Sequence, residues 1–466
     1  MAVFTLREIA ARTGGKAVAG DPGLTFHMFG IDSRLARRGE LFFAVKGRRD
    51  GHDFVADAAA KGAAGAVVSR PVPGLPKGFG LILVEDTTAA LAALAGSALA
   101  ARRGAVKVVG VTGSVGKTTT KDFTAELVGA RFRVLKSRGN FNNLLGLSLS
   151  LLELEPEHDA AVLEMGMSAA GEIRALTRVA APDVAVITNV NPVHLGFFRG
   201  LEGIAAAKRE ILEGAAEGAV AVLNANDPLV MELASGWKGR RVLFGIDGVS
   251  DVRAGNIARR QDGGLEFDLG YGRAEARVRF AFMNEAMIEN LLAAAAAALA
   301  LGVDLDPLLA RVPELKPAAR RGVTSRTSGG VAVYDDSYNS NPRALRAALT
   351  SLAGIPAARK VAVLADMLEL GPAEKDFHAE AGRTLAAAGW DVLVAVGPLA
   401  ALIAESAAAA GLSRENIHLF PDSSAAAARI RDIVRSGDLV LVKGSRGMCT
   451  DIIADALLEQ GGQGKE

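Results

Sequence analysis

The residues with the clearest chemical potential lie in the segment 106–120, VKVVGVTGSVGKTTT. A β-branched apolar run enters a glycine-rich turn, and Gly116, Lys117 and Thr118 then open a helix-compatible stretch. Backbone N–H groups of such a turn and helix N-terminus can bind phosphates, because they have no intrahelical partners. Lys117 can reach the β- and γ-phosphates of a nucleoside triphosphate, and the Thr118 hydroxyl can ligate Mg²⁺. The segment favours phosphate binding over a solvated Gly-Lys turn, although the usual motif has glycine where this chain has Val111.

Further polar side chains follow apolar, strand-like runs. Glu164 ends the run 160–166, where a carboxylate can supply the hard oxygen ligand that Mg²⁺ needs. His194, in TNVNPVHLG, could ligate a metal or orient a phosphate oxygen, and a solvated loop histidine is the alternative. Lys208 lies in a helical pattern, GIAAAKREILEG, which by itself favours a surface lysine near Glu210.

Clusters of amide and hydroxyl side chains mark possible sugar and phosphate contacts. Asn140, Asn142 and Asn143 lie together in GNFNNLLG, which is dense even for a turn. The segment 335–342, DDSYNSNP, could hydrogen-bond ribose hydroxyls, and Pro342 is compatible with a helix start. Turns near the N-terminus are also polar: Asp32, Ser33 and Arg34, then Lys46, then Asp50 and His52. These suit a phosphate or uracil ligand, or they are ordinary loop polarity.

Three α/β units must position these residues. Residues 1–85 alternate short apolar runs with helical stretches and predict a small α/β domain. Residues 86–315 predict a central doubly wound parallel sheet, with strands near 106–112, 133–137, 160–166, 184–190, 219–225 and 241–245. Apolar and polar residues alternate along 253–282, which indicates an antiparallel appendage, and an Ala-rich helix follows at 285–302. Residues 316–466 predict a second open parallel sheet that closes over its neighbour, with a hinge near Pro317.

Bulk properties limit the functional classes. The 466 residues carry 53 Lys and Arg against 52 Asp and Glu, so no basic field drives nucleic-acid binding. The longest apolar stretch, 291–303, is too short to cross a bilayer, which predicts no membrane insertion. The N-terminus lacks a signal-peptide pattern, and the single cysteine, Cys449, fits a reducing cytoplasm and is expected in a helix without chemistry of its own.

Taken together and in order, nine segments resemble the Mur ligases, the ATP-dependent amino-acid ligases of peptidoglycan synthesis. They are IDSR (31–34), DGHDF (50–54), TGSVGKTTT (112–120), GNFNN (139–143), LEMGM (163–167), AKREI (207–211), DDSYNSNP (335–342), ADMLELG (365–371) and VKGSRGM (442–448). Any one of them could arise by chance, but the ordered set covers nearly the whole chain and is very specific.

The resemblance implies a UDP-sugar domain, a central ATPase domain and a C-terminal domain with a dinucleotide-fold-like sheet. The best-matching member joins D-Ala-D-Ala to UDP-MurNAc-tripeptide, so a cytoplasmic, monomeric acid–D-amino acid ligase of cell-wall synthesis is expected. ATP would phosphorylate the terminal carboxylate, and the amine of D-Ala-D-Ala would attack the acyl phosphate. Because a carboxylate is a poor electrophile, activation must precede attack, and domain closure would keep water from the intermediate.

The resemblance also implies residue roles. Lys117 would hold the phosphates, Thr118 and Glu164 one Mg²⁺, and His194 a second Mg²⁺. Lys208 resembles the lysine that is carbamylated in this family, so it would be an anionic metal-site ligand. The expected catalytic set is Lys117, His194 and Lys208. Nucleotide contacts would come from Thr112, Gly113, Ser114, Val115, Gly116, Lys117, Thr118, Thr119, Asn290, Arg321, Asp336 and Asn339, and UDP-sugar contacts from Asp32, Ser33, Arg34, Lys46, Asp50, His52, Asn140, Asn142 and Asn143.

The chain departs from the family pattern at two places. The family often reads HNxxN before the Ala-rich helix, where this chain has AMIEN (286–290), and NNEIG where this chain has NNLLG (142–146).

The alternative within the family is the preceding ligase, which adds the third amino acid and typically carries a DNPR motif that is absent here. A folate polyglutamylating relative would lack the DGHDF-type domain, and a regulatory P-loop switch would need an NKxD that the chain does not contain. A non-catalytic binding module is disfavoured because Thr118, Glu164, His194 and Lys208 are all present. The third residue of the peptide, diaminopimelate or lysine, stays open.

Overall fold

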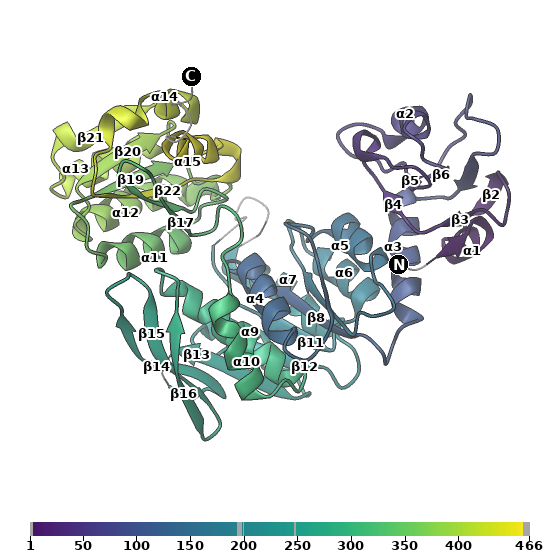
Figure 1. The fold of residues 1–466 in the computed structure, drawn as a ribbon, viewed down its shortest axis with the longest axis horizontal. Coiled ribbons are helices and arrows are strands. Elements are labelled where there is room, and N and C mark those ends of the chain that lie inside the picture. Colours follow the sequence, from purple (N-terminus) through teal and green to yellow (C-terminus); the bar gives the residue numbers. More distant parts are fainter. Residues whose placement is uncertain (1–2, 193–197, 199, 247, 460–466) are drawn as a thin grey trace.

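The computed structural model describes residues 3–192, 198, 200–246 and 248–459. These residues form sheets of five, nine and six strands, together with a two-stranded pair near the N-terminus. Figure 1 shows three lobes in chain order, with the central lobe between the N-terminal lobe (purple) and the C-terminal lobe (green to yellow). The predicted α/β fold with three domains is therefore confirmed.

The N-terminal lobe is built on a sheet with the order β2-β7-β6-β5-β4, parallel except for β2. Its elements are β1 (Phe4–Thr5), α1 (Leu6–Arg12), β2 (Lys16–Ala19), β3 (Thr25–Phe26), β4 (Phe29–Gly30), β5 (Leu41–Phe43), α2 (Val55–Ala60), β6 (Gly65–Val68) and β7 (Gly80–Leu83). Helix α3 (Thr87–Ala100) begins where Asp86 Oδ1 accepts from the N–H groups of Thr88 and Ala89. Because α3 also packs against α5 (Leu144–Leu152) and α6 (Glu172–Ala180) of the central lobe, one apolar core runs through both lobes.

The central sheet has the order β16-β15-β14-β13-β12-β11-β8-β10-β9. Its parallel part contains β8 (Lys107–Thr112), β9 (Val134–Lys136), β10 (Ala160–Glu164), β11 (Val184–Ile187), β12 (Val220–Asn224) and β13 (Arg241–Ile246). Strand β8 lies between β10 and β11. After β8 the chain adds β9 and β10 on one side of this strand and then β11, β12 and β13 on the other side. Ligands of doubly wound sheets bind at such a switch point, beyond the carboxyl ends of the strands.

Helices cover both faces of this sheet because successive strand residues face opposite sides. Along β10, Ala161 and Leu163 join the core that contains α5 (Leu144–Leu152), α6 (Glu172–Ala180) and α7 (Gly200–Glu213). Ala160 and Val162 face the other core, with α4 (Lys117–Val128) and the Ala-rich α9 (Ala286–Ala300). The small alanine side chains let α9 pack closely on α4 and on β12 and β13. Helices α8 (Pro228–Leu233) and α10 (Leu305–Arg311) complete the lobe.

The predicted antiparallel appendage is continuous with the central sheet. Strands β14 (Val252–Arg259), β15 (Leu265–Tyr271) and β16 (Ala274–Phe280) form antiparallel pairs, but β14 joins β13 in a parallel pairing. The hairpins therefore extend one edge of the central sheet toward the C-terminal lobe (Figure 1).

The C-terminal sheet has the order β17-β18-β22-β19-β20-β21 and is parallel except for the edge strand β17 (Val323–Arg326), which the sequence pattern did not predict. The others are β18 (Ala332–Asp335), β19 (Arg359–Ala365), β20 (Val392–Val396), β21 (Ile417–Phe420) and β22 (Asp438–Lys443). Leucines of β19 and β22 face the core that contains α11 (Pro342–Ala353), α12 (Glu374–Ala387) and α13 (Ala400–Ala409). Valines face α14 (Ser423–Ile433) and α15 (Asp451–Leu458).

Candidate functional site

A cavity of about 540 Å³ lies between the central and C-terminal lobes. Central residues from the ends of β8, β10 and β11 line one side, and residues that follow β18 and β22 line the other. Among the predicted residues, the lining includes Ser114, Val115, Gly116, Lys117, Thr118, Thr119, Asn140, Asn142, Asn143, Glu164, Asn290, Arg321, Asp336 and Asn339. Residues that lie far apart in the sequence therefore meet in one space.

The glycine turn between β8 and α4 forms the floor of this cavity. Gly116, with φ of 84°, precedes α4, and no side chain caps the helix. The first-turn N–H groups are therefore available to an anion. A side chain at Gly113 would collide with the Thr188 hydroxyl, and one at Gly116 with the Asn290 amide, so both positions require glycine. Val111 lies inside β8, paired with Glu164 and Val186, which explains why this position needs no glycine.

Lys117 and Arg321 are two cations that line the cavity close to each other. Lys117 Nζ donates to the carbonyl oxygens of Gly113 (2.9 Å) and Ser114 (3.1 Å). Burial lowers the pKa of Lys117, the Glu164 carboxylate opposes this shift, and the nearby Arg321 guanidinium adds to it. An anion such as a triphosphate would relieve the repulsion between these two cations.

The hydroxyl and the carboxylate predicted for Mg²⁺ lie side by side. Thr118 Oγ1 donates to Glu164 Oε2 at 2.7 Å, and Asn142 Nδ2 donates to Glu164 Oε1 at 2.9 Å. Glu164 is 1% exposed. Within the described ranges, no three His, Cys, Asp or Glu side chains come together to hold a metal by themselves. One hydroxyl and one carboxylate fit Mg²⁺, which commonly takes its other ligands from substrate phosphates and water.

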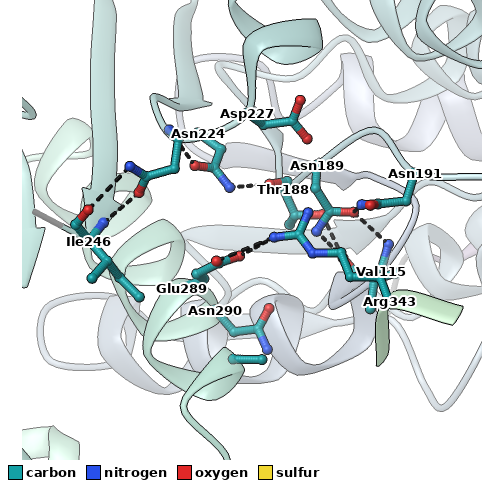
Figure 2. Close-up of polar contacts among 12 residues, drawn as sticks. Val115, Thr188, Asn189, Asn191, Asn224, Asp227, Ile246, Glu289, Asn290 and Arg343 are labelled. Atoms are coloured by element: carbon teal, nitrogen blue, oxygen red, sulfur yellow. Dashed lines mark hydrogen bonds and ion pairs between the residues drawn. The ribbon is translucent and has the colours of Figure 1, made fainter. Parts of the chain in front are cut away.

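Asn189, which follows β11, fixes the backbone of the phosphate turn (Figure 2). Its Oδ1 accepts from Val115 N at 2.9 Å and its Nδ2 donates to Val115 O at 3.0 Å. Thr188 Oγ1 donates to the same carbonyl at 2.7 Å, and Asn191 Nδ2 donates to Asn189 Oδ1 at 2.9 Å. The sequence pattern places Asn189 among the polar residues at the carboxyl ends of the strands, but Asn189 was not among the residues expected to contact a ligand.

An ion pair joins the two lobes beside the predicted adenine contact. Arg343, at the start of α11, lies 2.9 Å from Glu289 of α9, and both line the cavity (Figure 2). The neighbouring Asn290 accepts from Thr120 Oγ1 at 3.3 Å and donates to Met287 Sδ at 3.6 Å. The family pattern has an asparagine where this chain has Met287. Here the sulfur atom of Met287 accepts from the Asn290 amide instead.

The C-terminal wall of the cavity carries both charge signs. Asp336 pairs with Lys443, whose ammonium also donates to Asn339 O at 3.0 Å. Burial raises the pKa of Asp336, and Lys443 opposes that rise. The Arg321 guanidinium lies over the Tyr338 ring, 3.9 Å from its centroid, and both residues line the cavity.

Lys208 lies in α7, is 2% exposed and is absent from the cavity lining. The surface-lysine alternative is therefore wrong. Burial, and then the charge of Lys117, lower the pKa of Lys208 well below its usual value. His194, the ligand expected for a second Mg²⁺, lies outside the described residues.

The predicted residues of the N-terminal lobe do not reach the cavity. Asp32 pairs with Arg34 at 2.7 Å, and Ser33 is buried beside them. His52 Nδ1 lies 2.6 Å from Asp50 Oδ1, while Ser69 N donates to His52 Nε2 at 2.8 Å, so the Nδ1 position carries the proton. Lys46 forms a backbone bridge with Asp50. Thr112, the last residue of β8, and Gly113, the first residue of the phosphate turn, are also absent from the cavity lining.

Among the residues that the structure describes, every helix falls short of the length and apolar character that a membrane crossing requires.

Comparisons with known proteins identify the same family in all three lobes. Residues 25–98 match the family model "Mur ligase family, catalytic domain", residues 111–298 match "Mur ligase middle domain", and residues 320–446 match "Mur ligase, glutamate ligase domain". The UDP-N-acetylmuramoyl-tripeptide–D-alanyl-D-alanine ligase of Bacillus subtilis is 35% identical, over 93% of each chain. The enzyme of that name from Escherichia coli is 33% identical, over 99% of this chain and 100% of that protein.

Solved structures give the same result. A crystal structure of MurF from Acinetobacter baumannii is similar with a TM-score of 0.89 and 31% identity, over 98% of this chain and 99% of that chain. MurF from Thermotoga maritima in complex with ADP has a TM-score of 0.81 and 31% identity, over 92% of this chain and 96% of that chain. Sequence and structure thus agree from the N-terminal lobe to the last sheet, and the chain belongs to the Mur ligase family.

Proposed function

We propose that the chain is an ATP-dependent ligase that joins D-Ala-D-Ala to UDP-MurNAc-tripeptide and forms UDP-MurNAc-pentapeptide for peptidoglycan synthesis. The observation that carries the proposal is the cavity, where an open phosphate turn meets the Thr118–Glu164 pair and cationic side chains of a second lobe. The names of the curated relatives support the choice of substrates.

The residues on both sides of the cavity would share the chemistry. The turn 113–116, the first turn of α4 and Lys117 would hold the triphosphate, and Arg321 and Asn290 would contact it and the adenine. Asp336 and Asn339 would contact the ribose side. Mg²⁺, held by Thr118 and Glu164, would supply charge neutralisation at the transferred phosphate. The terminal carboxylate takes the γ-phosphoryl group, the amine of D-Ala-D-Ala adds to the acyl carbon, and phosphate leaves with one carboxylate oxygen.

Lys208 would act as a carbamate. Burial lowers the pKa of Lys208 and so favours its unprotonated amine, which can add to CO₂ and release one proton. The product is an anion that could join a second Mg²⁺ with His194, and it would remove the repulsion between Lys208 and Lys117.

The proposal also includes the domain limits, the UDP-sugar contacts, the cellular location and the oligomeric state. We propose domain limits at 1–85, 86–315 and 316–466, with Asp32, Ser33, Arg34, Lys46, Asp50 and His52 on the UDP-sugar together with Asn140, Asn142 and Asn143. The strands of the three sheets fall within these limits, at 4–83, 107–280 and 323–443. We also propose a cytoplasmic monomer, in keeping with the single Cys449.

The test is product formation from ATP, UDP-MurNAc-tripeptide and D-Ala-D-Ala, followed by mass spectrometry. Tripeptides that end in diaminopimelate and in lysine are both supplied. A pentapeptide product supports the proposal and identifies the preferred third residue. If only UDP-MurNAc-dipeptide with a free diamino acid reacts, the chain is the preceding ligase, and if neither pair reacts, the peptidoglycan substrate is wrong.

A further inference from the structure

A second lysine of α4 lies one helical turn beyond Lys117 and has no role in the proposed reaction. Lys121 is only 1% exposed. Its Nζ donates to the carbonyl oxygens of Ser137 at 2.9 Å and Gly139 at 3.1 Å, and Asp122 Oδ1 lies 3.5 Å away. Burial of an ammonium is unfavourable unless its hydrogen bonds are made, so these two carbonyl contacts are what retain the cation inside the protein.

The two carbonyls belong to the start of a loop that lines the cavity. This loop runs from β9 to α5 and carries Asn140, Asn142 and Asn143. Its far end is fixed by Asn143, whose Oδ1 accepts from Gly146 N at 2.9 Å and caps α5. Lys121 fixes its near end. The three asparagines therefore lie on a segment that is held at both ends.

The same loop contacts the candidate metal carboxylate. Ser137 Oγ accepts from Glu164 N at 3.1 Å, and Asn142 Nδ2 donates to Glu164 Oε1. Gly166 N donates to Asn142 O at 2.8 Å, and a side chain at Gly166 would collide with the Asn142 amide. Helix α4 thus holds Glu164 twice, directly through Thr118 and indirectly through Lys121 and the loop.

We propose that Lys121 is a positioning residue that locks the loop 137–143 against α4 and Glu164, and so couples the phosphate site to the loop that faces the UDP-sugar. The identity of that ligand rests on the proposed function, whereas the contacts that define the lock do not. Without the ammonium, two buried carbonyls lose their donor and the loop gains conformational freedom. Binding of the UDP-sugar then has to reorder the loop.

Lys136, a second lysine beside Asp122, offers a matched control. Lys136 of β9 pairs with the same Asp122, at 3.1 Å, but its side chain is 54% exposed and donates to no loop carbonyl. Lys121→Met and Lys136→Met therefore remove the same charge near the same carboxylate, and only the first breaks the lock. Lys121→Arg retains donors and serves as the rescue variant.

The experiment measures amide hydrogen exchange of residues 137–146 by mass spectrometry, together with KM for both substrates. We expect faster exchange in Lys121→Met alone, with KM for UDP-MurNAc-tripeptide raised about tenfold and KM for ATP changed less than about twofold. Lys121→Arg should recover most of that KM. Unchanged exchange, equal rises in both KM values, or the same effect in Lys136→Met would overturn the proposal. If Lys121→Met does not fold, Lys121→Gln, whose side chain is uncharged and shorter, takes its place in the same two readouts.

The two failures are distinguishable. A wild-type chain that does not use UDP-MurNAc-tripeptide contradicts the proposed function, and the exchange experiment, which needs no turnover, still decides whether Lys121 orders the loop.

Discussion

The Thr118 hydroxyl and the Glu164 carboxylate are joined by a 2.7 Å hydrogen bond across the ends of α4 and β10. This contact brings together two groups that lie 46 positions apart in the sequence. Both residues line the cavity beside the phosphate turn, so the proposed metal site would combine a hydroxyl and a carboxylate that are in direct contact.

Glu164→Gln should reduce kcat about a hundredfold, because an amide retains the shape but removes the negative charge that Mg²⁺ needs. The apparent requirement for Mg²⁺ should rise as well. Steady-state phosphate release over a range of Mg²⁺ concentrations measures both quantities. Glu232→Gln, on the exposed side of α8, is the control and should match wild type. A fully active Glu164→Gln enzyme would exclude Glu164 from the metal site.

Asn189→Ala should raise KM for ATP about tenfold, since Val115 N–H loses its acceptor and the phosphate turn loses its order. Asn226 offers a close control, because it makes the same two-point contact with the backbone of Ile246, at 2.6 and 3.1 Å, outside the cavity lining. Asn226→Ala should lower the free energy of unfolding without changing KM for ATP. Equal KM values in the two variants would mean that Asn189 is only structural.

Removal of CO₂ should reduce activity, and bicarbonate should restore it, because Lys208 would lose and regain its carbamate. Lys208→Ala should be inactive and should not respond to bicarbonate. Labelled bicarbonate should give a carbamate signal in the nuclear magnetic resonance spectrum of wild type alone. An unimpaired Lys208→Ala enzyme would remove the carbamate from the account.

Lys208 should also make stability depend on pH. Its pKa in the fold lies well below 10.5, so between these two values the unfolded chain binds one more proton than the native protein. The free energy of unfolding must therefore rise with pH across this window, by up to about 1.4 kcal/mol per pH unit. In CO₂-free buffer, Lys208→Met should lose this slope relative to wild type. Denaturant unfolding at several alkaline pH values measures the difference, and parallel curves would contradict the buried neutral amine.

The parts of the fold that follow a simple period could be predicted from the sequence. The apolar runs near 106–112, 133–137, 160–166, 184–190, 219–225 and 241–245 identified the central sheet correctly, and the order strand, glycine turn, helix at 107–128 identified the phosphate turn. Edge strands without such a signal were missed, as for β17. Cys449, expected in a helix, instead lies between two helices with φ of 53°, and this expectation was wrong.

The candidate site could be predicted only in part, because its chemistry depends on which strand ends meet. Lys117, Thr118 and Glu164 were identifiable from local patterns. The burial of Lys208, the Asn189 contact with Val115 and the pairing of Arg343 with Glu289 come from tertiary packing, which no local pattern encodes. The UDP-sugar contacts at Asp32 and Asp50 stay predictions.

The central claim is that ATP activates the tripeptide carboxylate as an acyl phosphate. The direct measurement uses UDP-MurNAc-tripeptide labelled with heavy oxygen in its terminal carboxylate, with ATP and D-Ala-D-Ala. Phosphate leaves with one carboxylate oxygen in this route, so the released phosphate should carry one labelled oxygen for each amide bond formed. Unlabelled phosphate, released while the pentapeptide forms, would contradict the account.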